Sequence, residues 1–193
     1  MTVAPDDPTA PLELSSFGVD ARALGEEDFI TRHGSAFLLH QGAFDPDRKP
    51  VRPQATLILG RSQFPPAEPD TGTHGAPRAG FKGMSALHVY PVKHTGRSPF
   101  PRIVTVGRTK NNDIVMADIS ISKFHAFFKE EGGQWCLADA ESRNGTFVEG
   151  ERVLSTKQGK PTTLKGGTRV KFGALEFRFV DAKEFLVLAR QFG

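Results

Sequence analysis

The sequence lacks the residue groupings on which most enzymes and crosslinked proteins depend. Its 193 residues include one cysteine, Cys136, so no intrachain disulfide can form, and its six histidines are scattered without metal-ligand spacing. It contains no recognisable pairing of nucleophile and base, no carboxylate pair and no P-loop. The sequence therefore predicts a protein that is not an enzyme and that uses no metal or cofactor.

Long apolar stretches and charge clusters are missing as well. No run approaches the roughly 18 apolar residues of a membrane-spanning helix, and the first residues, MTVAPDDPTAPLELSS, do not resemble a secretory signal. We therefore expect a cytoplasmic protein. The net charge is +3, without a run of five like charges, which favours an anionic ligand only weakly and leaves nucleic-acid binding as an alternative.

The abundant residues indicate a strand-rich fold. The chain has 20 glycines and 14 prolines, which predict many turns, and its 16 phenylalanines and 38% hydrophobic content can fill one main core. All-β is therefore the predicted class. The length allows one sizeable domain and an appendage.

The N-terminal part shows less regular patterning. Residues 1–16 have the composition of a disordered tail, and residues 17–61 are predicted to be a small α/β extension. This extension would contain a short helix over about 18–30 and two strands over 35–40 and 54–60.

A segment rich in proline and glycine, residues 62–83, is predicted to be a linker. Beyond it, over 84–181, short apolar segments alternate with turn signals at the spacing of a β-sandwich, and residues 182–193 change to the pattern of a C-terminal helix. The predicted strands are ALHVYPV, RIVTVG, DIVM, FHAFFK, QWCLAD, GTFVEG, RVL, TTLK, TRVKF and LEFRFV.

Polar residues suited to a phosphate gather between Gly107 and Gly150, in loops between these strands. Arg108 can donate two parallel hydrogen bonds to phosphate, and Ser122 adds a hydroxyl. The amide of Asn144 can donate and accept at once, which suits the backbone of an extended peptide. Lys123 and Arg143 are further candidate cations beside these groups.

The ordered motifs GR, NNDI, SISKFHA and ESRNGTFVEG resemble the forkhead-associated (FHA) domain. The resemblance covers about residues 84–181 and implies an eleven-stranded β-sandwich whose apical loops bind phosphothreonine peptides. It implies that Arg108 and Ser122 bind phosphate, that Asn144 holds the peptide backbone, and that Lys123 and Arg143 assist. Structural support of the site is assigned to Gly107, His125, Gly145 and Thr146.

Two departures and one repetition qualify this resemblance. Phe124 makes the SKFH loop more apolar, and Glu149 stands where asparagine is frequent in the family. The segment TLILGRSQ at 56–63 echoes VTVGRTKN at 105–112, but no counterpart of SKFH or RNGT follows it. One complete site is therefore expected.

The leading hypothesis is a phosphothreonine-peptide-binding adaptor downstream of Ser/Thr protein kinases. Its partners would be phosphothreonine proteins, the kinase or the substrates of that kinase. The alternative is a scaffold that binds partners through the sandwich surface or the N-terminal extension regardless of phosphorylation. Self-association is a further hypothesis, because Thr9, Thr71 or Thr73 could occupy the site of the same or a neighbouring chain once phosphorylated.

Overall fold

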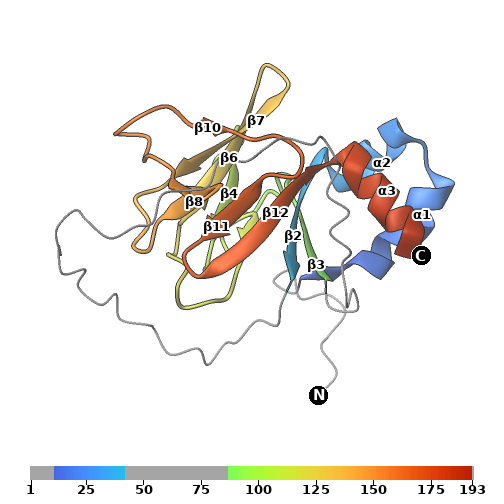
Figure 1. The fold of residues 1–193 in the computed structure, drawn as a ribbon, viewed down its shortest axis with the longest axis horizontal. Helices are drawn as coiled ribbons and strands as arrows, with labels where there is room; N and C mark the ends of the chain where they lie inside the picture. Colours follow the sequence, from blue (N-terminus) through green and yellow to red (C-terminus); the bar gives the residue numbers. More distant parts are fainter. Residues whose placement is uncertain (1–10, 42–86, 193) are drawn as a thin grey trace, which may run out of the picture.

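The computed structural model describes residues 11–41 and 87–192, and within them two β-sheets face each other (Figure 1). The first sheet contains, in spatial order, β1 (Leu12–Glu13), β3 (Leu87–Pro91), β2 (Ala36–Gln41), β12 (Leu175–Asp181), β11 (Arg169–Phe172), β8 (Thr146–Val148) and β9 (Glu151–Arg152). The second contains β10 (Thr162–Thr163), β7 (Gln134–Asp139), β6 (Ala126–Glu131), β4 (Val104–Gly107) and β5 (Ile114–Val115).

The sheets enclose the main hydrophobic core, as the alternation in the sequence predicts. In β12, Leu175, Phe177 and Phe179 are buried, whereas Glu176 and Arg178 between them are exposed. Successive side chains of a strand point to opposite faces, so this pattern directs one face of β12 toward the second sheet. The predicted all-β sandwich is confirmed.

The described residues form twelve strands: ten of them, β3 to β12, lie in the region for which the resemblance implied eleven, and β1 and β2 come from the N-terminal part. The strand predicted over 35–40 as part of an extension is β2, a central strand of the larger sheet. It pairs antiparallel with β3 on one side and β12 on the other. The physical reason is that β2 is apolar on both faces: Leu38 packs into the sandwich core, and Phe37 packs on the opposite face.

Helices cover that opposite face and form a second core with it. They are η1 (Leu14–Phe17), α1 (Gly18–Ala23), α2 (Glu26–His33) and the predicted C-terminal helix, α3 (Ala182–Phe192). Figure 1 shows α1, α2 and α3 together beside the ends of β2 and β12. The rings of Phe37 and Phe185 stack with their centroids 3.9 Å apart, which fastens α3 to β2.

Two N-terminal boundaries differ from the sequence prediction. The tail was predicted to extend to residue 16, but Leu12–Glu13 pair with β3, and Leu14 is buried. The helix predicted over 18–30 is two helices, because Leu24 has extended backbone and Gly25 is the N-cap of α2. The strand predicted over 54–60, the linker over 62–83, and Thr9, Thr71 and Thr73 lie outside the described residues.

The strand pairing brings three connections to one edge of the sandwich. β4 ends at Gly107, directly after Val106 pairs with Ala126 at the start of β6. Ala126 in turn pairs with Asp139 at the end of β7. The segment after β4, the segment before β6 and the segment after β7 therefore meet at this edge. All the candidate site residues lie there.

Candidate functional site

Ser122 joins the three loops at this edge. Its carbonyl oxygen accepts a hydrogen bond from the backbone N–H of Arg108 at 3.0 Å. Its hydroxyl oxygen accepts one from the backbone N–H of Arg143 at 3.1 Å. The structure thus brings Arg108, Ser122 and Arg143 together from three separate parts of the sequence.

The polar groups predicted to meet a ligand keep bonding capacity in this arrangement. A serine hydroxyl has one donor and two acceptor positions, so the bond from Arg143 leaves the O–H of Ser122 able to donate. Asn144 donates from Nδ2 to the carbonyl oxygen of Ser120 at 2.7 Å. That bond orients the exposed amide and leaves its Oδ1 able to accept from a ligand N–H.

His125 is fully buried and braces two of the loops. The N–H of Ser122 donates to Nδ1 at 3.0 Å, so Nδ1 carries no proton, and Nε2 donates to the carbonyl oxygen of Gly145 at 3.2 Å. Burial lowers the pKa of His125 below its ordinary value, although the Gly145 carbonyl and the charge of Asp139 act in the opposite direction. The neutral imidazole is therefore part of the framework beneath the site.

Gly107 permits a close approach between the first two loops. A Cβ at this position would lie 2.2 Å from the carbonyl oxygen of Lys123 and 2.6 Å from Nδ2 of Asn112. That carbonyl accepts from Asn112 Nδ2 at 2.8 Å and from the hydroxyl of Thr109 at 2.9 Å. The backbone of Lys123 is therefore fixed, while its side chain is exposed.

A buried carboxylate, Asp139, organises the third loop. It accepts from the N–H of Ser142 at 2.9 Å, from the Ser142 hydroxyl at 2.6 Å and from the Thr146 hydroxyl at 2.7 Å. The N–H of Gly145 donates to the Ser142 oxygen at 3.0 Å. These bonds shape the turn that presents Asn144.

Sequence reasoning did not single out several of these supporting residues. Asn112 lies in the quoted NNDI motif, and Ser120 and Ser142 lie in SISKFHA and ESRNGT, so the motifs contained the signal. Asp139 is the last residue of the predicted strand QWCLAD, a position typical of a carboxylate that accepts bonds from the following turn.

The cations of the site have no neutralising partner within residues 11–41 and 87–192. None of the ion pairs among the described residues includes Arg108, Lys123 or Arg143, and all three side chains are exposed. Glu149, by contrast, accepts from the N–H of Arg169 and pairs with its guanidinium at 3.0 Å; these hydrogen bonds lower the pKa of its carboxyl group. Its charge is therefore already matched within the protein.

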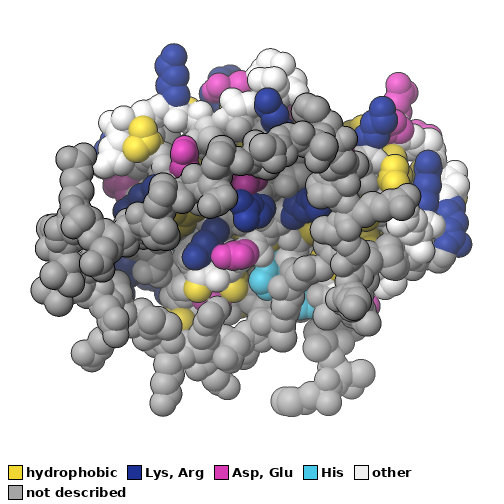
Figure 2. Space-filling view, viewed as in Figure 1, with side chains coloured by type: hydrophobic (Ala, Val, Ile, Leu, Met, Phe, Trp, Pro, Cys, Tyr) yellow, Lys and Arg dark blue, Asp and Glu magenta, His cyan; other side chains and the backbone are white. Residues whose placement is uncertain are grey.

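Outside the three loops, the described residues on the face drawn in Figure 2 form no continuous stripe of basic side chains. Figure 2 shows Lys and Arg side chains of the described residues interspersed with Asp and Glu on that face.

No described helix has the length and apolar character needed to cross a bilayer. The described residues also contain no group of His, Cys, Asp and Glu that could hold a metal ion.

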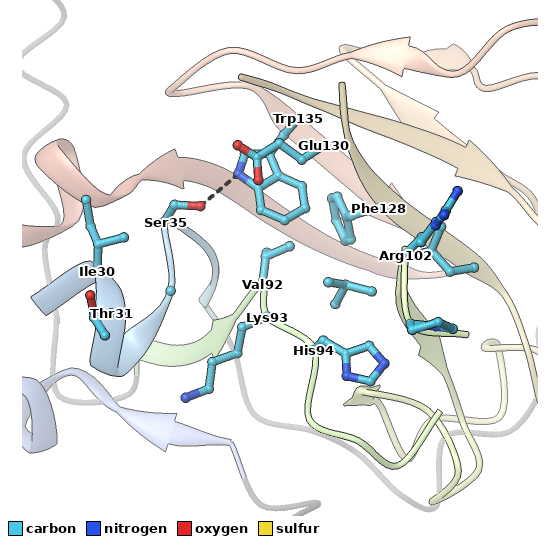
Figure 3. A pocket seen from close by; sticks show the side chains of 14 residues that line it. Ile30, Thr31, Ser35, Val92, Lys93, His94, Arg102, Phe128, Glu130 and Trp135 are labelled. Carbon is cyan, nitrogen blue, oxygen red and sulfur yellow. Dashed lines mark hydrogen bonds between the residues drawn. The ribbon is translucent and has the colours of Figure 1, made fainter. Parts of the chain in front are cut away.

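A hollow of about 540 Å³ lies at the opposite ends of the same strands (Figure 3). Val104 at the start of β4 and Trp135 near the start of β7 line it, whereas the loops follow the ends of these strands. Trp135 donates from Nε1 to the hydroxyl oxygen of Ser35 at 3.2 Å, which ties the start of β2 to the second sheet. None of the candidate site residues lines this hollow.

The domain is thus a two-sheet sandwich that presents hydroxyl, amide and cationic groups from three braced loops. Residues 104–173 match the FHA domain. The glycogen accumulation regulator GarA of Mycolicibacterium smegmatis is 32% identical over a match of 115 residues that covers 56% of this chain and 67% of GarA. The chain belongs to the FHA domain family, as its motifs predict.

Other similar proteins are larger than the shared region. An ABC transporter ATP-binding/permease protein of Mycobacterium tuberculosis is 34% identical over 116 residues, which are 60% of this chain and 13% of the transporter. A solved structure of Mycobacterium tuberculosis EmbR in complex with a low affinity phosphopeptide is 29% identical, with a TM-score of 0.37, over 42% of this chain and 20% of EmbR. This chain thus spans only a minor part of these two proteins.

Proposed function

We propose that this protein is an adaptor that binds phosphothreonine peptides and acts downstream of Ser/Thr protein kinases. The observation that carries the proposal is the junction of three loops at Ser122, which holds a donor hydroxyl beside exposed cations that form no ion pair with an acidic residue in the described part of the chain. Membership of the FHA domain family supports it. The adaptor performs no catalysis and recognises a modification that the kinase has made.

The chemistry of phosphothreonine matches the groups at this edge. The phosphate carries roughly −1.5 to −2 charges and three acceptor oxygens at neutral pH. The Arg108 guanidinium supplies a permanent charge and paired donors, and the Ser122 hydroxyl supplies a neutral donor to another oxygen. Arg143 and Lys123 add positive potential at the same edge.

Asn144 serves the peptide rather than the phosphate. Its amide is anchored to Ser120 at one N–H, so the remaining polar atoms face a ligand in a fixed orientation. A peptide in extended conformation offers a C=O and an N–H at each residue, and a single amide side chain can engage both. Holding the backbone next to the phosphothreonine in this way needs no particular neighbouring side chain.

Titration calorimetry with matched peptides tests the proposal. A phosphothreonine peptide selected from a degenerate library is compared with its unphosphorylated twin, for the wild type, Arg108→Ala and Arg102→Ala. Arg102 is the matched control, because it is an exposed arginine just before β4, whereas Arg108 follows β4 at the other end. A lost charge-assisted bond is worth about 1.5 to 3 kcal/mol, so Arg108→Ala should weaken binding by roughly 10- to 100-fold.

The control and the twin peptide separate the alternatives. We expect Arg102→Ala to bind within about threefold of the wild type, since only long-range attraction changes. Equal binding of both peptides, unchanged in Arg108→Ala, would establish the phosphorylation-independent scaffold instead. Strong binding of DNA or RNA that falls steeply with salt would favour nucleic-acid recognition.

A further inference from the structure

The turn that joins β11 to β12 lies against two of the three loops of the candidate site. It consists of the two residues Gly173 and Ala174. The N–H of Gly173 donates to the carbonyl oxygen of Gly145 at 3.0 Å, and the N–H of Ala174 donates to the hydroxyl oxygen of Ser120 at 3.0 Å. The turn is therefore bonded both to the loop before β6 and to the loop after β7.

The pairing of the first sheet explains why the turn lies there. β11 pairs with β8 on one side and β12 on the other, and Phe172 lies opposite Thr146 at the start of β8. Gly173 follows Phe172 and Gly145 precedes Thr146, so their backbones meet just beyond the last paired residues. A two-residue hairpin with glycine first is a favoured connection. The strand ladder thus holds the turn in place.

Ser120 is held at each of its polar groups. Its N–H donates to Oδ1 of the buried Asp118 at 2.7 Å. Its hydroxyl oxygen accepts from Ala174, and its carbonyl oxygen accepts from Nδ2 of Asn144 at 2.7 Å. The position of the carbonyl that orients Asn144 therefore depends on the turn as well as on the loop of Ser120 itself.

Gly173 leaves no room for a side chain beside that carbonyl. It is buried, and its φ of 55° lies in the left-handed region that glycine adopts without strain. A Cβ at this position would lie 2.5 Å from the carbonyl oxygen of Ser120 and 2.9 Å from its hydroxyl oxygen. The glycine therefore permits the hydrogen bond that orients the amide of Asn144.

The same turn fixes the backbone that follows Asn144. The carbonyl oxygen of Gly145 accepts from Nε2 of His125 at 3.2 Å and from the N–H of Gly173. These two donors can occupy both lone pairs of the oxygen. Asn144 is thus constrained twice, at its side chain through Ser120 and at the next residue through Gly173.

The turn has no such bond to the groups assigned to the phosphate. Within residues 11–41 and 87–192, no hydrogen bond joins it to Arg108 or Ser122. We infer that Gly173 and Ser120 are positioning residues, through which the β11–β12 turn orients Asn144 and so sets how tightly the backbone of a phosphothreonine peptide is held. This inference rests on the proposed function and adds a fourth segment to the site.

Gly173→Ala tests the inference in two titrations, one with a phosphothreonine peptide by calorimetry and one with inorganic phosphate by NMR chemical shifts. The displaced Ser120 carbonyl no longer anchors Asn144, so one or two hydrogen bonds to the peptide are lost. The affinity for the peptide should fall about 5- to 30-fold, and that for inorganic phosphate by less than about twofold.

Gly132→Ala is the matched control for the strain of alanine at a positive φ. Gly132 lies in the β6–β7 turn with a φ of 58°, and no heavy atom lies within 4 Å of a built Cβ. The backbone strain is therefore similar to that at Gly173, without the collision. Both affinities of this variant should stay within about twofold of the wild type.

A double-mutant cycle with Asn144→Ala separates positioning from general damage. Because Gly173 acts through Asn144, Gly173→Ala should reduce the peptide affinity by less than about twofold once Asn144 is alanine. Ser120→Ala removes only the hydroxyl that accepts from Ala174, and should weaken peptide binding about two- to fivefold. Ser120→Thr keeps the hydroxyl and should restore the affinity.

Each outcome decides the inference. Equal losses for peptide and inorganic phosphate, or additive losses in the double mutant, overturn the positioning role, because the turn then supports the fold as a whole. Unchanged peptide affinity in Gly173→Ala and Ser120→Ala also overturns it, while phosphopeptide binding survives. If thermal unfolding shows that Gly173→Ala does not fold, the Ser120 pair decides. A wild type that binds phosphorylated and unphosphorylated peptides equally overturns the proposed function instead.

Discussion

Substitution of Gly107 by alanine tests whether the stability of the protein depends on the close approach of the loop after β4 to the loop before β6. The new Cβ would lie 2.2 Å from the Lys123 carbonyl oxygen and 2.6 Å from Asn112 Nδ2, closer than Cβ atoms approach other heavy atoms in real proteins. The carbonyl is backbone and cannot rotate away. The loop of Lys123 must therefore move by about 1 Å.

This displacement breaks the hydrogen bonds that join the two loops. They run from the Arg108 N–H to the Ser122 carbonyl at 3.0 Å, and from Asn112 and Thr109 to the Lys123 carbonyl. At about 1 kcal/mol each, their loss lowers the free energy of unfolding by about 3 kcal/mol. The Tm should fall by roughly 6 to 12 °C for a protein of this size.

Thermal unfolding by circular dichroism measures this change, with Gly25→Ala as the control. Gly25 has no heavy atom within 4 Å of a built Cβ, and its φ of −66° suits alanine. It is the N-cap of α2, so alanine there costs at most about 1 kcal/mol. A Tm of Gly107→Ala equal to that of the control, with unchanged phosphopeptide affinity, would refute the reasoning.

Other expectations concern titration and packing. Burial lowers the pKa of His125 in the folded protein, so the unfolded chain binds a proton at this histidine first as the pH falls. The contribution of the neutral His125 to the free energy of unfolding is therefore complete above about pH 6.5 and is lost as the pH falls below that value. Urea titrations from pH 7.5 to 5.5 should show a smaller decrease for His125→Gln. Phe37→Ala removes the ring stacked on Phe185 and should cost about 3 to 5 kcal/mol, measured by urea unfolding. Ser35→Ala removes the hydrogen bond from Trp135 and should shift the fluorescence emission maximum of this single tryptophan. An emission maximum equal to that of the wild type would contradict the hydrogen bond.

Much of the sandwich could be predicted because its strands are amphipathic and separated by turn residues. The alternation of Leu175, Phe177 and Phe179 fixes both the strand and its buried face. The position of β2 could not be predicted in this way. A short apolar run such as AFLLH indicates burial on both faces but contains no information about which strands lie beside it.

The site shows the same division between local and long-range information. Arg108, Ser122 and Asn144 are visible in short motifs, since each motif combines a turn signal with a polar side chain. The contacts among them depend on registers between distant strands, and Asp139 acts through residues of the following turn. The roles assigned to the binding residues stay predictions until phosphopeptides are titrated.

The central position of β2 has a consequence for cutting the chain. Because β2 is bonded to β3 on one side and β12 on the other, a break between Gln41 and Leu87 would leave an N-terminal fragment inserted in the sheet of the remainder. The two fragments should therefore copurify after cleavage and reassemble when produced separately. A fragment that begins at Leu87 and is produced alone would leave β3 without both of its partners, β1 and β2, and one edge of β12 unpaired, and it should aggregate. The protein thus offers a natural division point for a two-part reporter.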